Sequence, residues 1–273
     1  MINFNGELVS ANKSILSKDN RGLKYGDGVF ETIKMHNSKL IFFEEHYFRL
    51  MASMRMLRMD IPMNFTLEYV ESQIQRVAKA NKLVEFARVR LTVFRKDGGL
   101  YTPMTNEIDF VIEVTELNID IKNQFTVELY KDFYIYSGLL STIKTTNRIL
   151  NVVASIFSKE NDFDSCLLIN EKKQLVEAIY GNIFLVFGTT VVTPSITSGC
   201  VKGIVRAKLI NILKKKLSFS VEEREVSPFE LQKADELFIT NSIIDIQPVT
   251  NYRKKVYKKE ITTQIAELLR NSY

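Results

Sequence analysis

The most informative stretch of this chain is Ser141-Thr142-Ile143-Lys144-Thr145-Thr146-Asn147-Arg148. It places Lys144 at the end of an extended, aromatic-rich segment and just before an apolar, helix-like run, Ile149 to Phe157. A mostly apolar setting disfavours the ammonium form, so the pKa of a lysine there falls. A lysine that is neutral near pH 7 can form a Schiff base. Lysines and arginines number 37, and most of them must be solvated, so Lys144 needs support from other residues.

The composition indicates a folded protein with a sizeable core. The chain has 273 residues, 45% hydrophobic and 25% charged, which is enough for two ordinary domains or one large one. No apolar run approaches the length of a membrane helix, and the first residues lack the pattern of a signal peptide. Two cysteines, Cys166 and Cys200, are typical of a reducing compartment, so we expect a cytoplasmic protein without a membrane partner.

Charge and motifs exclude several classes of function. The net charge of +5 favours anionic partners. The densest basic cluster, residues 252–260, alternates with aromatic residues and is typical of a solvated hairpin, so we expect no nucleic-acid surface. The only histidines, His36 and His46, have no acidic residues at ligand spacing, which argues against a metal site. The chain also lacks a nucleophile elbow and the Walker and Rossmann glycine motifs.

Hydrophobic periodicity predicts an α+β organisation. Strands are expected over 28–35, 40–43, 86–94, 108–114, 125–129, 165–170, 182–187, 220–226, 236–240 and 243–249, and helices over 44–59, 66–81, 149–161, 203–217 and 262–270. The strand pattern breaks at residues 117–123. We therefore predict a small N-terminal α+β domain over 1–116, a linker over 117–123 and a larger C-terminal α/β domain over 124–273 that carries Lys144.

Three further segments contain residues that could bind a ligand or take part in catalysis, and each also has a purely structural interpretation. Ser198 to Arg206 runs from a glycine turn into a helix, and a helix N-terminus suits a phosphate, although it can be an ordinary helix entry. Thr240-Asn241-Ser242 lies between two strands and could bind a phosphate or simply form a turn. Glu177 lies among apolar residues; if buried it needs a partner, and otherwise it is a solvent-facing strand residue.

Together these segments resemble the class IV aminotransferases, the fold type IV family of pyridoxal phosphate enzymes. That family includes branched-chain aminotransferases, D-amino acid aminotransferases and aminodeoxychorismate lyase. Its landmarks occur in family order over nearly the whole chain, at residues 19–31, 45–50, 143–144, 177 with 182–184, 203–206 and 234–241. The resemblance implies an α+β, two-domain fold like that of D-amino acid aminotransferases, with pyridoxal 5'-phosphate as the cofactor.

The resemblance also implies roles for individual residues. Lys144 is similar to the lysine that binds the cofactor aldehyde as an internal aldimine and then moves the substrate Cα proton. Arg49 matches the arginine that binds the cofactor phosphate, a task suited to a guanidinium. Glu177 matches the carboxylate that keeps the pyridine nitrogen protonated, so that the ring withdraws electrons. The family's remaining phosphate-binding positions correspond to Ile204, Val205, Thr240 and Asn241.

The substrate residues are less defined. Phe30 stands where D-amino acid aminotransferases have an active-site tyrosine, and Leu100 stands where their carboxylate-binding arginine is expected. Both departures count against D-amino acid specificity. Arg90 and Arg95 are candidates to bind a substrate carboxylate, but strand alternation places them on opposite faces of one strand. Phe30, Arg90 and Arg95 are therefore the candidate substrate residues.

Two activities and one non-catalytic alternative follow. The favoured activity is transfer of an amino group between an amino acid and a 2-oxo acid. Asn147-Arg148 after the lysine, and Asn241-Ser242, favour instead an aminodeoxychorismate lyase that releases pyruvate and p-aminobenzoate. A protein that kept only the fold is the third alternative, which the retained Lys144, Arg49 and Glu177 oppose. The resemblance implies a homodimer in which a loop from the partner closes the substrate pocket.

Overall fold

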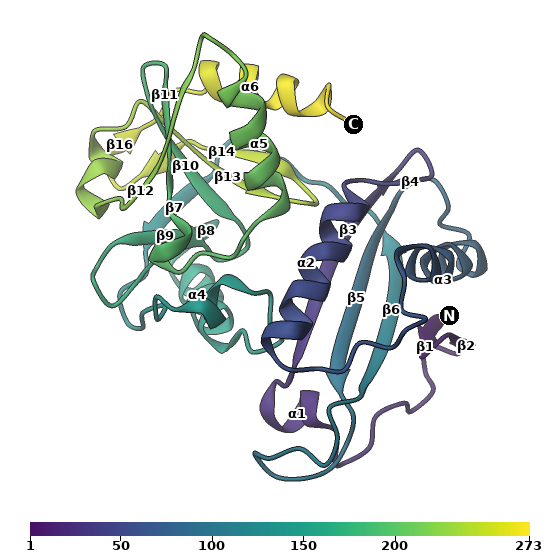
Figure 1. Cartoon of the computed structure of the whole chain (residues 1–273). Coiled ribbons are helices and arrows are strands. Elements are labelled where there is room, and N and C mark those ends of the chain that lie inside the picture. Colours follow the sequence, from purple (N-terminus) through teal and green to yellow (C-terminus); the bar gives the residue numbers. More distant parts are fainter. The chain divides into compact units, whose positions relative to one another are not determined.

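The computed structural model describes residues 1–273, which form two compact units (Figure 1). Unit 1 comprises Met1–Asn118 and Lys144–Asn147, and unit 2 comprises Ile119–Ile143 and Arg148–Tyr273. The first crossing between the units thus lies within the predicted linker, 117–123.

One part of the predicted division needs correction, because residues 144–147 join unit 1 and not the C-terminal unit. The Phe30 amide donates to the Lys144 carbonyl at 2.9 Å, and the Thr146 amide donates to the Gly28 carbonyl at 2.9 Å. These bonds attach the lysine segment to the edge of a strand more than a hundred residues earlier. Such non-local pairing leaves no mark in the local sequence pattern.

Unit 1 is built on one antiparallel sheet with strand order β2-β1-β6-β5-β3-β4. Its elements are β1 (Ile2–Phe4), β2 (Glu7–Val9), α1 (Arg21–Tyr25), β3 (Gly28–His36), β4 (Lys39–Leu40), α2 (Phe43–Met56), α3 (Leu67–Ala80), β5 (Ala87–Arg95) and β6 (Ile108–Glu116). The strand expected over 40–43 is shorter than predicted, because Phe42 adopts a left-handed conformation (φ 53°) that turns the chain into α2.

Helices α2 and α3 cover one face of this sheet. On α3, the Thr66 hydroxyl caps the N-terminus by accepting from the Tyr69 amide, and Val70, Ile74 and Val77 recur at helical spacing towards the core. Alternation along β3 sends Val29, Ile33 and Met35 into the same core. The opposite face of the sheet therefore carries the even-numbered residues of β3.

Unit 2 contains two five-stranded sheets with strand orders β12-β11-β10-β13-β14 and β16-β15-β7-β8-β9. Its strands are β7 (Thr126–Leu129), β8 (Ser165–Ile169), β9 (Leu175–Ala178), β10 (Asn182–Phe187), β11 (Thr190–Pro194), β12 (Ser220–Arg224), β13 (Glu236–Asn241), β14 (Asp245–Val249), β15 (Asn251–Tyr252) and β16 (Lys255–Val256). Buried side chains of both sheets, such as Leu167, Ile183 and Leu237, share one hydrophobic core. Strands β9 and β11 were not predicted as separate strands.

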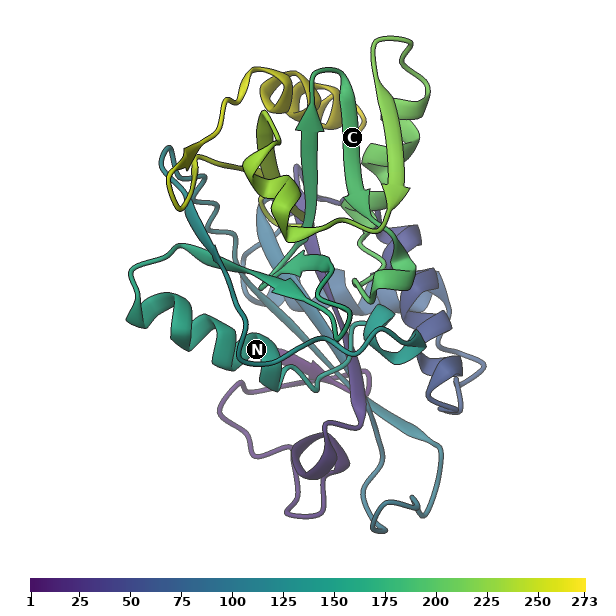
Figure 2. The same cartoon turned by 90° about the vertical axis from the view of Figure 1, so that its left-hand side faces the viewer.

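Unit 2 contains three α-helices and three short 3-10 helices. They are η1 (Leu139–Thr142), α4 (Ile149–Glu160), η2 (Ile196–Ser198), α5 (Ile204–Lys214), η3 (Pro228–Gln232) and α6 (Glu260–Arg270). Helices α5 and α6 contact each other and β13, whereas α4 contacts β8 (Figure 1). Figure 2 shows the same chain turned by 90°, with α6 in yellow. Across the chain, every helix is too short or too polar to cross a membrane.

A buried carboxylate fixes the start of α6 and leads to a stability prediction. Glu236 is 1% exposed and accepts hydrogen bonds from the Ile261 amide (2.8 Å), the Thr262 amide (2.7 Å) and the Thr262 hydroxyl (2.6 Å). Glu236→Gln replaces one acceptor by an NH₂ group that faces these donors and removes charge from the helix N-terminus. We expect the free energy of unfolding to fall by about 1–3 kcal/mol, measured by urea denaturation.

The control for this prediction is Glu267→Gln on the exposed side of the same helix. It should change the free energy of unfolding by less than about 0.5 kcal/mol. Equal effects of the two substitutions would show that Glu236 does not cap α6.

Candidate active site

In unit 1, Lys144 and Arg90 flank one aromatic ring. The Lys144 ammonium nitrogen lies 4.4 Å from the centre of the Phe30 ring, and the Arg90 guanidinium carbon lies 4.0 Å from it. Phe30 is opposite Thr92 in the β3–β5 register, and the Thr92 hydroxyl accepts from Arg90 Nε at 3.3 Å. Burial lowers the pKa of the Arg90 guanidinium, while Glu113 opposes this shift. These contacts gather two basic side chains on the sheet face that α2 and α3 leave uncovered.

On the helix-covered face, the predicted phosphate arginine is held by a buried carboxylate. Arg49 Nε donates to Glu31 Oε1 at 2.7 Å, and Arg49 Nη2 donates to Oε2 at 2.5 Å. Glu31 is 1% exposed, and burial alone would raise its pKa. Arg49 and His46 outweigh that effect and lower the pKa to about 2. The carboxylate is therefore ionised at neutral pH.

His46 completes this cluster. Its Nδ1 lies 2.6 Å from Glu31 Oε2, and its side chain is fully buried. Burial lowers the pKa of His46, against the opposing effect of Glu31, and the positive charges of Arg49 and Lys144 lower it further. The ring is thus neutral at pH 7 and donates through Nδ1, while the buried Nε2 has no hydrogen-bond partner.

Arg95 requires a correction, because its surroundings are those of a structural residue. Its side chain is buried; Nε donates to Asp27 at 2.9 Å, Nη1 to the Asn106 side chain at 2.6 Å and Nη2 to the Leu57 carbonyl at 2.6 Å. Arg21 shares the same Asp27 carboxylate at 2.8 Å. Protein groups accept hydrogen bonds from all three nitrogens of Arg95, so this guanidinium is not a candidate to bind a substrate carboxylate.

In unit 2, Glu177 lies on β9 and is 5% exposed, so the buried alternative is confirmed. Its Oε2 accepts a hydrogen bond from the Val201 amide at 2.9 Å. Val201 also accepts, through its carbonyl, from the Asn182 side chain at 2.9 Å. The loop that leads into α5 is therefore tied to two neighbouring strands, and its position relative to the carboxylate is set.

The start of α5 has the features of an anion site. The helix begins at Ile204, which is followed by Val205. Its N-cap residue is Gly203, which has no side chain, so no side chain caps the first N–H groups of the helix. A Cβ on Gly203 would lie 1.9 Å from Asn182 Oδ1, and Asn182 is opposite Thr240 in the sheet. The buried Thr240 hydroxyl has no hydrogen-bond partner. The unpaired first amides of α5 are the kind of donors that bind a phosphate group.

Asn241 behaves differently from Thr240. Its Oδ1 accepts from the amides of Ile243 (2.9 Å) and Ile244 (3.0 Å), and its Nδ2 donates to the Tyr180 carbonyl at 3.1 Å. The side chain of Asn241 therefore shapes the turn after β13, which was the plain alternative for this segment.

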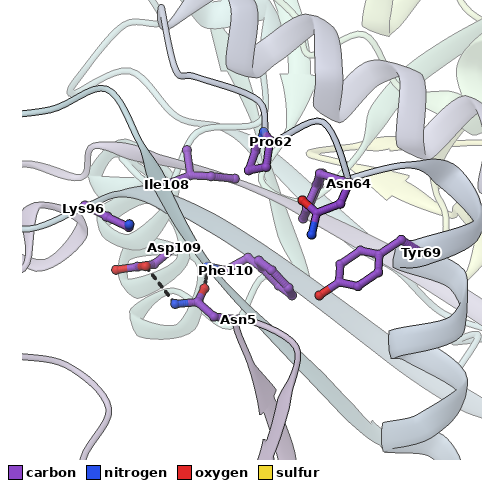
Figure 3. Close-up of a pocket in the computed structure, with 9 residues that line it drawn as sticks. Asn5, Pro62, Asn64, Tyr69, Lys96, Ile108, Asp109 and Phe110 are labelled. Atoms are coloured by element: carbon purple, nitrogen blue, oxygen red, sulfur yellow. Dashed lines mark hydrogen bonds between the residues drawn. The ribbon is translucent and has the colours of Figure 1, made fainter.

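A hollow in unit 1 is separate from these residues. It has a volume of about 240 Å³ and is lined by Asn5, Pro62, Asn64, Phe65, Tyr69, Lys96, Ile108, Asp109 and Phe110 (Figure 3). Within it, Asn5 Nδ2 donates to Asp109 Oδ1 at 2.8 Å. None of the candidate site residues lines this cavity, so we do not assign the cofactor to it.

Comparison with known proteins identifies the family. The family model described as "Amino-transferase class IV" matches residues 28–252, which include every candidate residue from Phe30 to Asn241. This chain belongs to the class IV aminotransferases. These enzymes use pyridoxal phosphate, so the chain is a pyridoxal-phosphate-dependent aminotransferase or a closely related lyase.

Named relatives of this class IV chain fall into two groups. It is 27% identical to a Methanocaldococcus jannaschii protein whose name places it among the branched-chain-amino-acid aminotransferases, over 100% of this chain and 94% of that protein. It is 26% identical to the D-alanine aminotransferase of Bacillus licheniformis, over 91% of this chain and 87% of the relative.

Solved structures confirm fold type IV. The branched-chain aminotransferase of Thermoproteus uzoniensis matches with a TM-score of 0.90 and 22% identity, over 99% of this chain and 93% of that one. The 4-amino-4-deoxychorismate lyase of Pseudomonas aeruginosa matches with a TM-score of 0.87 and 24% identity, over 99% and 98% of the two chains. Because an aminotransferase and a lyase fit comparably, the fold does not distinguish the two reactions.

Two residues of the site, Glu31 and His46, were missed as functional candidates. The signals were present: alternation along β3 places Glu31 on the helix-facing side, and His46 lies three residues before Arg49, on the same side of α2. A buried glutamate that faces a histidine and an arginine predicts an ionic cluster, and the structure contains one.

Proposed function

We propose that this class IV chain is an aminotransferase that moves an amino group between an amino acid and a 2-oxo acid, with Lys144 as its catalytic residue. The observation that carries the proposal is the position of the Lys144 amine over the Phe30 ring, in the unit that also holds the buried Arg49–Glu31 pair. Two relatives whose names place them among the aminotransferases, one for branched-chain amino acids and one for D-alanine, support this reaction class.

Each residue of the candidate site has a separate proposed role. Pyridoxal phosphate, when bound, supplies an aldehyde for the substrate amine and a ring that withdraws electrons. By the family resemblance, Arg49 of unit 1 would bind the phosphate through its guanidinium, and the same role is proposed for the first amides of α5 and the Thr240 hydroxyl of unit 2. Glu177 would keep a proton on the ring nitrogen, because a buried carboxylate stabilises a positive charge beside it. Lys144 would hold the cofactor aldehyde, and its amine would then carry the proton from the substrate Cα to the cofactor C4′.

We further propose that Arg90 binds a carboxylate of the substrate and that Phe30 holds Arg90 in place. Arg90→Ala should raise the KM for amino and 2-oxo acids about 10- to 100-fold, because a charge-assisted hydrogen bond is lost, while cofactor affinity stays the same. Steady-state kinetics with a panel of L- and D-amino donors measures this. Arg88→Ala, two residues away on β5, is the matched control. An unchanged KM would show that Arg90 does not bind the substrate carboxylate.

The lyase remains the second candidate, because Thr145-Thr146-Asn147-Arg148 follows the lysine. Incubation with aminodeoxychorismate tests for p-aminobenzoate, and incubation with an amino acid plus 2-oxoglutarate tests for glutamate. Formation of p-aminobenzoate without glutamate would replace the aminotransferase proposal by the lyase. Colourless protein that takes up no pyridoxal phosphate would instead support a non-catalytic protein.

We also propose a homodimer. The loop of unit 1 that follows β5 exposes three apolar side chains, Leu100 (78%), Tyr101 (90%) and Met104 (81%). A loop of this kind suits the role of a segment that closes the substrate pocket of a second copy. Light scattering on the purified protein tests this, and a monomeric mass at assay concentration would exclude it.

A further inference from the structure

We propose that Glu31 and His46 are positioning residues, which hold the Arg49 guanidinium in the orientation that binds the phosphate of pyridoxal phosphate. The inference rests on the proposed role of Arg49. Neither residue needs to touch the cofactor, because both act through the arginine.

The first argument is the geometry of the ion pair. Glu31 occupies the Nε–Nη2 edge of the guanidinium with both of its oxygens, at 2.7 and 2.5 Å. A guanidinium is planar, so fixing one edge also fixes the direction of the opposite edge, which carries Nη1. An unrestrained arginine would have to be ordered when the phosphate binds, and a preorganised one avoids that loss of affinity.

The second argument is the burial of the whole cluster. Glu31 comes from β3, whereas His46 and Arg49 come from α2 and project from the same side of that helix. The exposed fractions of the three side chains are 2%, 0% and 11%, so solvent hardly screens the contact between strand and helix. A carboxylate buried in this way keeps its charge only if its partners remain in place.

The third argument concerns the hydrogen-bond donors to Glu31. Oε1 accepts from Arg49, and Oε2 accepts from both Arg49 and His46. The donor on His46 therefore prevents the carboxylate from rotating away from the arginine. His46→Asn can keep such a donor, because the asparagine NH₂ group lies close to where Nδ1 was. His46→Leu cannot, so the two substitutions form a matched pair.

Three charged groups act on His46 and set its response to pH. They are Arg49 on α2, Glu31 on β3 and Lys144 beside β3. His46 has a lowered pKa, so its contribution to stability is present above its ordinary value of 6.5 and declines below it. Glu31 has a pKa of about 2, so its contribution is present above its ordinary value of 4.5 and is lost as the pH falls from there towards 2.

The experiment compares the affinity for pyridoxal phosphate with that for pyridoxal, which lacks the phosphate. Both are titrated by absorbance into protein freed of cofactor, for the wild type, Arg49→Ala, Glu31→Gln, His46→Leu and His46→Asn. Glu31→Gln should weaken pyridoxal phosphate binding about tenfold and leave pyridoxal binding unchanged, because a hydrogen-bonded charge that orients the arginine is lost. His46→Leu should weaken it about threefold, and His46→Asn should restore it.

A double mutant identifies the route of the effect. If Glu31 acts only through Arg49, Glu31→Gln adds nothing further to pyridoxal phosphate affinity in an Arg49→Ala background. Equal losses for pyridoxal and pyridoxal phosphate, or fully additive losses in the double mutant, would overturn the inference. If Glu31→Gln does not fold, the His46 pair decides: equal affinities of the leucine and asparagine variants overturn it.

Failure of the proposed function has a different signature. If Arg49→Ala itself leaves the preference for pyridoxal phosphate over pyridoxal unchanged, the assignment of Arg49 to the phosphate is wrong. If Arg49→Ala removes that preference and Glu31→Gln does not change it, only the positioning role is wrong.

Discussion

Lys144→Ala should abolish turnover, with kcat falling by at least about 10³-fold. The substitution removes both the amine that bonds the cofactor and the base that moves the substrate proton. Stability should change little, since the main-chain bond from the Phe30 amide to the residue 144 carbonyl does not depend on the side chain. Turnover assays with the preferred amino donor measure the loss.

A chemical experiment locates the bond independently of turnover. Borohydride reduction of the wild-type holoenzyme, followed by peptide mass spectrometry, should place the cofactor mass on the peptide that contains Lys144. Lys159→Ala, at the exposed end of α4, serves as the control and should keep both label and activity. A label on another lysine would exclude Lys144 from the proposed role, whatever the kinetics of its alanine variant.

Glu177→Gln should lower kcat about 10²- to 10³-fold while the protein still binds the cofactor. Glutamine has nearly the same shape and can still accept the hydrogen bond from the Val201 amide, so the loop before α5 should keep its position. The negative charge that holds a proton on the ring nitrogen is lost, and the ring then withdraws electrons less well. The expected result is therefore a fall in kcat with little change in cofactor affinity.

The control for Glu177 is Glu160→Gln, at the exposed end of α4, which should leave kcat unchanged. Single-turnover measurements with excess enzyme separate the proton-transfer step from product release. A kcat within about twofold of wild type would contradict the pairing of Glu177 with the ring nitrogen.

Local signals in the sequence predicted most helices and strands well. The helix expected over 66–81 matches α3, Leu67–Ala80, to within one residue at each end. The prediction for α2 ran three residues too far, to Met59, because Arg58 adopts a left-handed conformation (φ 57°) that breaks the helix. Conformations of this kind depend on tertiary contacts and are hard to read from composition.

The sequence predicted the residues of the candidate site less completely than it predicted the helices and strands. Arg49, Lys144 and Glu177 came from the resemblance to the family, and their roles stay predictions until they are tested. Arg95 could not be assigned correctly from sequence, because the groups that hold it lie 11, 37, 38 and 68 residues away. The alternation of residues along β5 predicts the face of the sheet on which the Arg95 side chain lies, but it does not predict the acceptors that bind the guanidinium there.

The return of residues 144–147 to unit 1 also constrains how the protein is made. The N-terminal sheet can gain this last edge segment only after the ribosome has delivered residue 147, well after Asn118. Folding of that sheet must therefore tolerate a late, long-range closure, which is slow compared with local pairing. A fragment that ends at the domain boundary would lack the lysine altogether. Gene-fusion or split-protein designs should therefore keep residues 1–147 on one polypeptide.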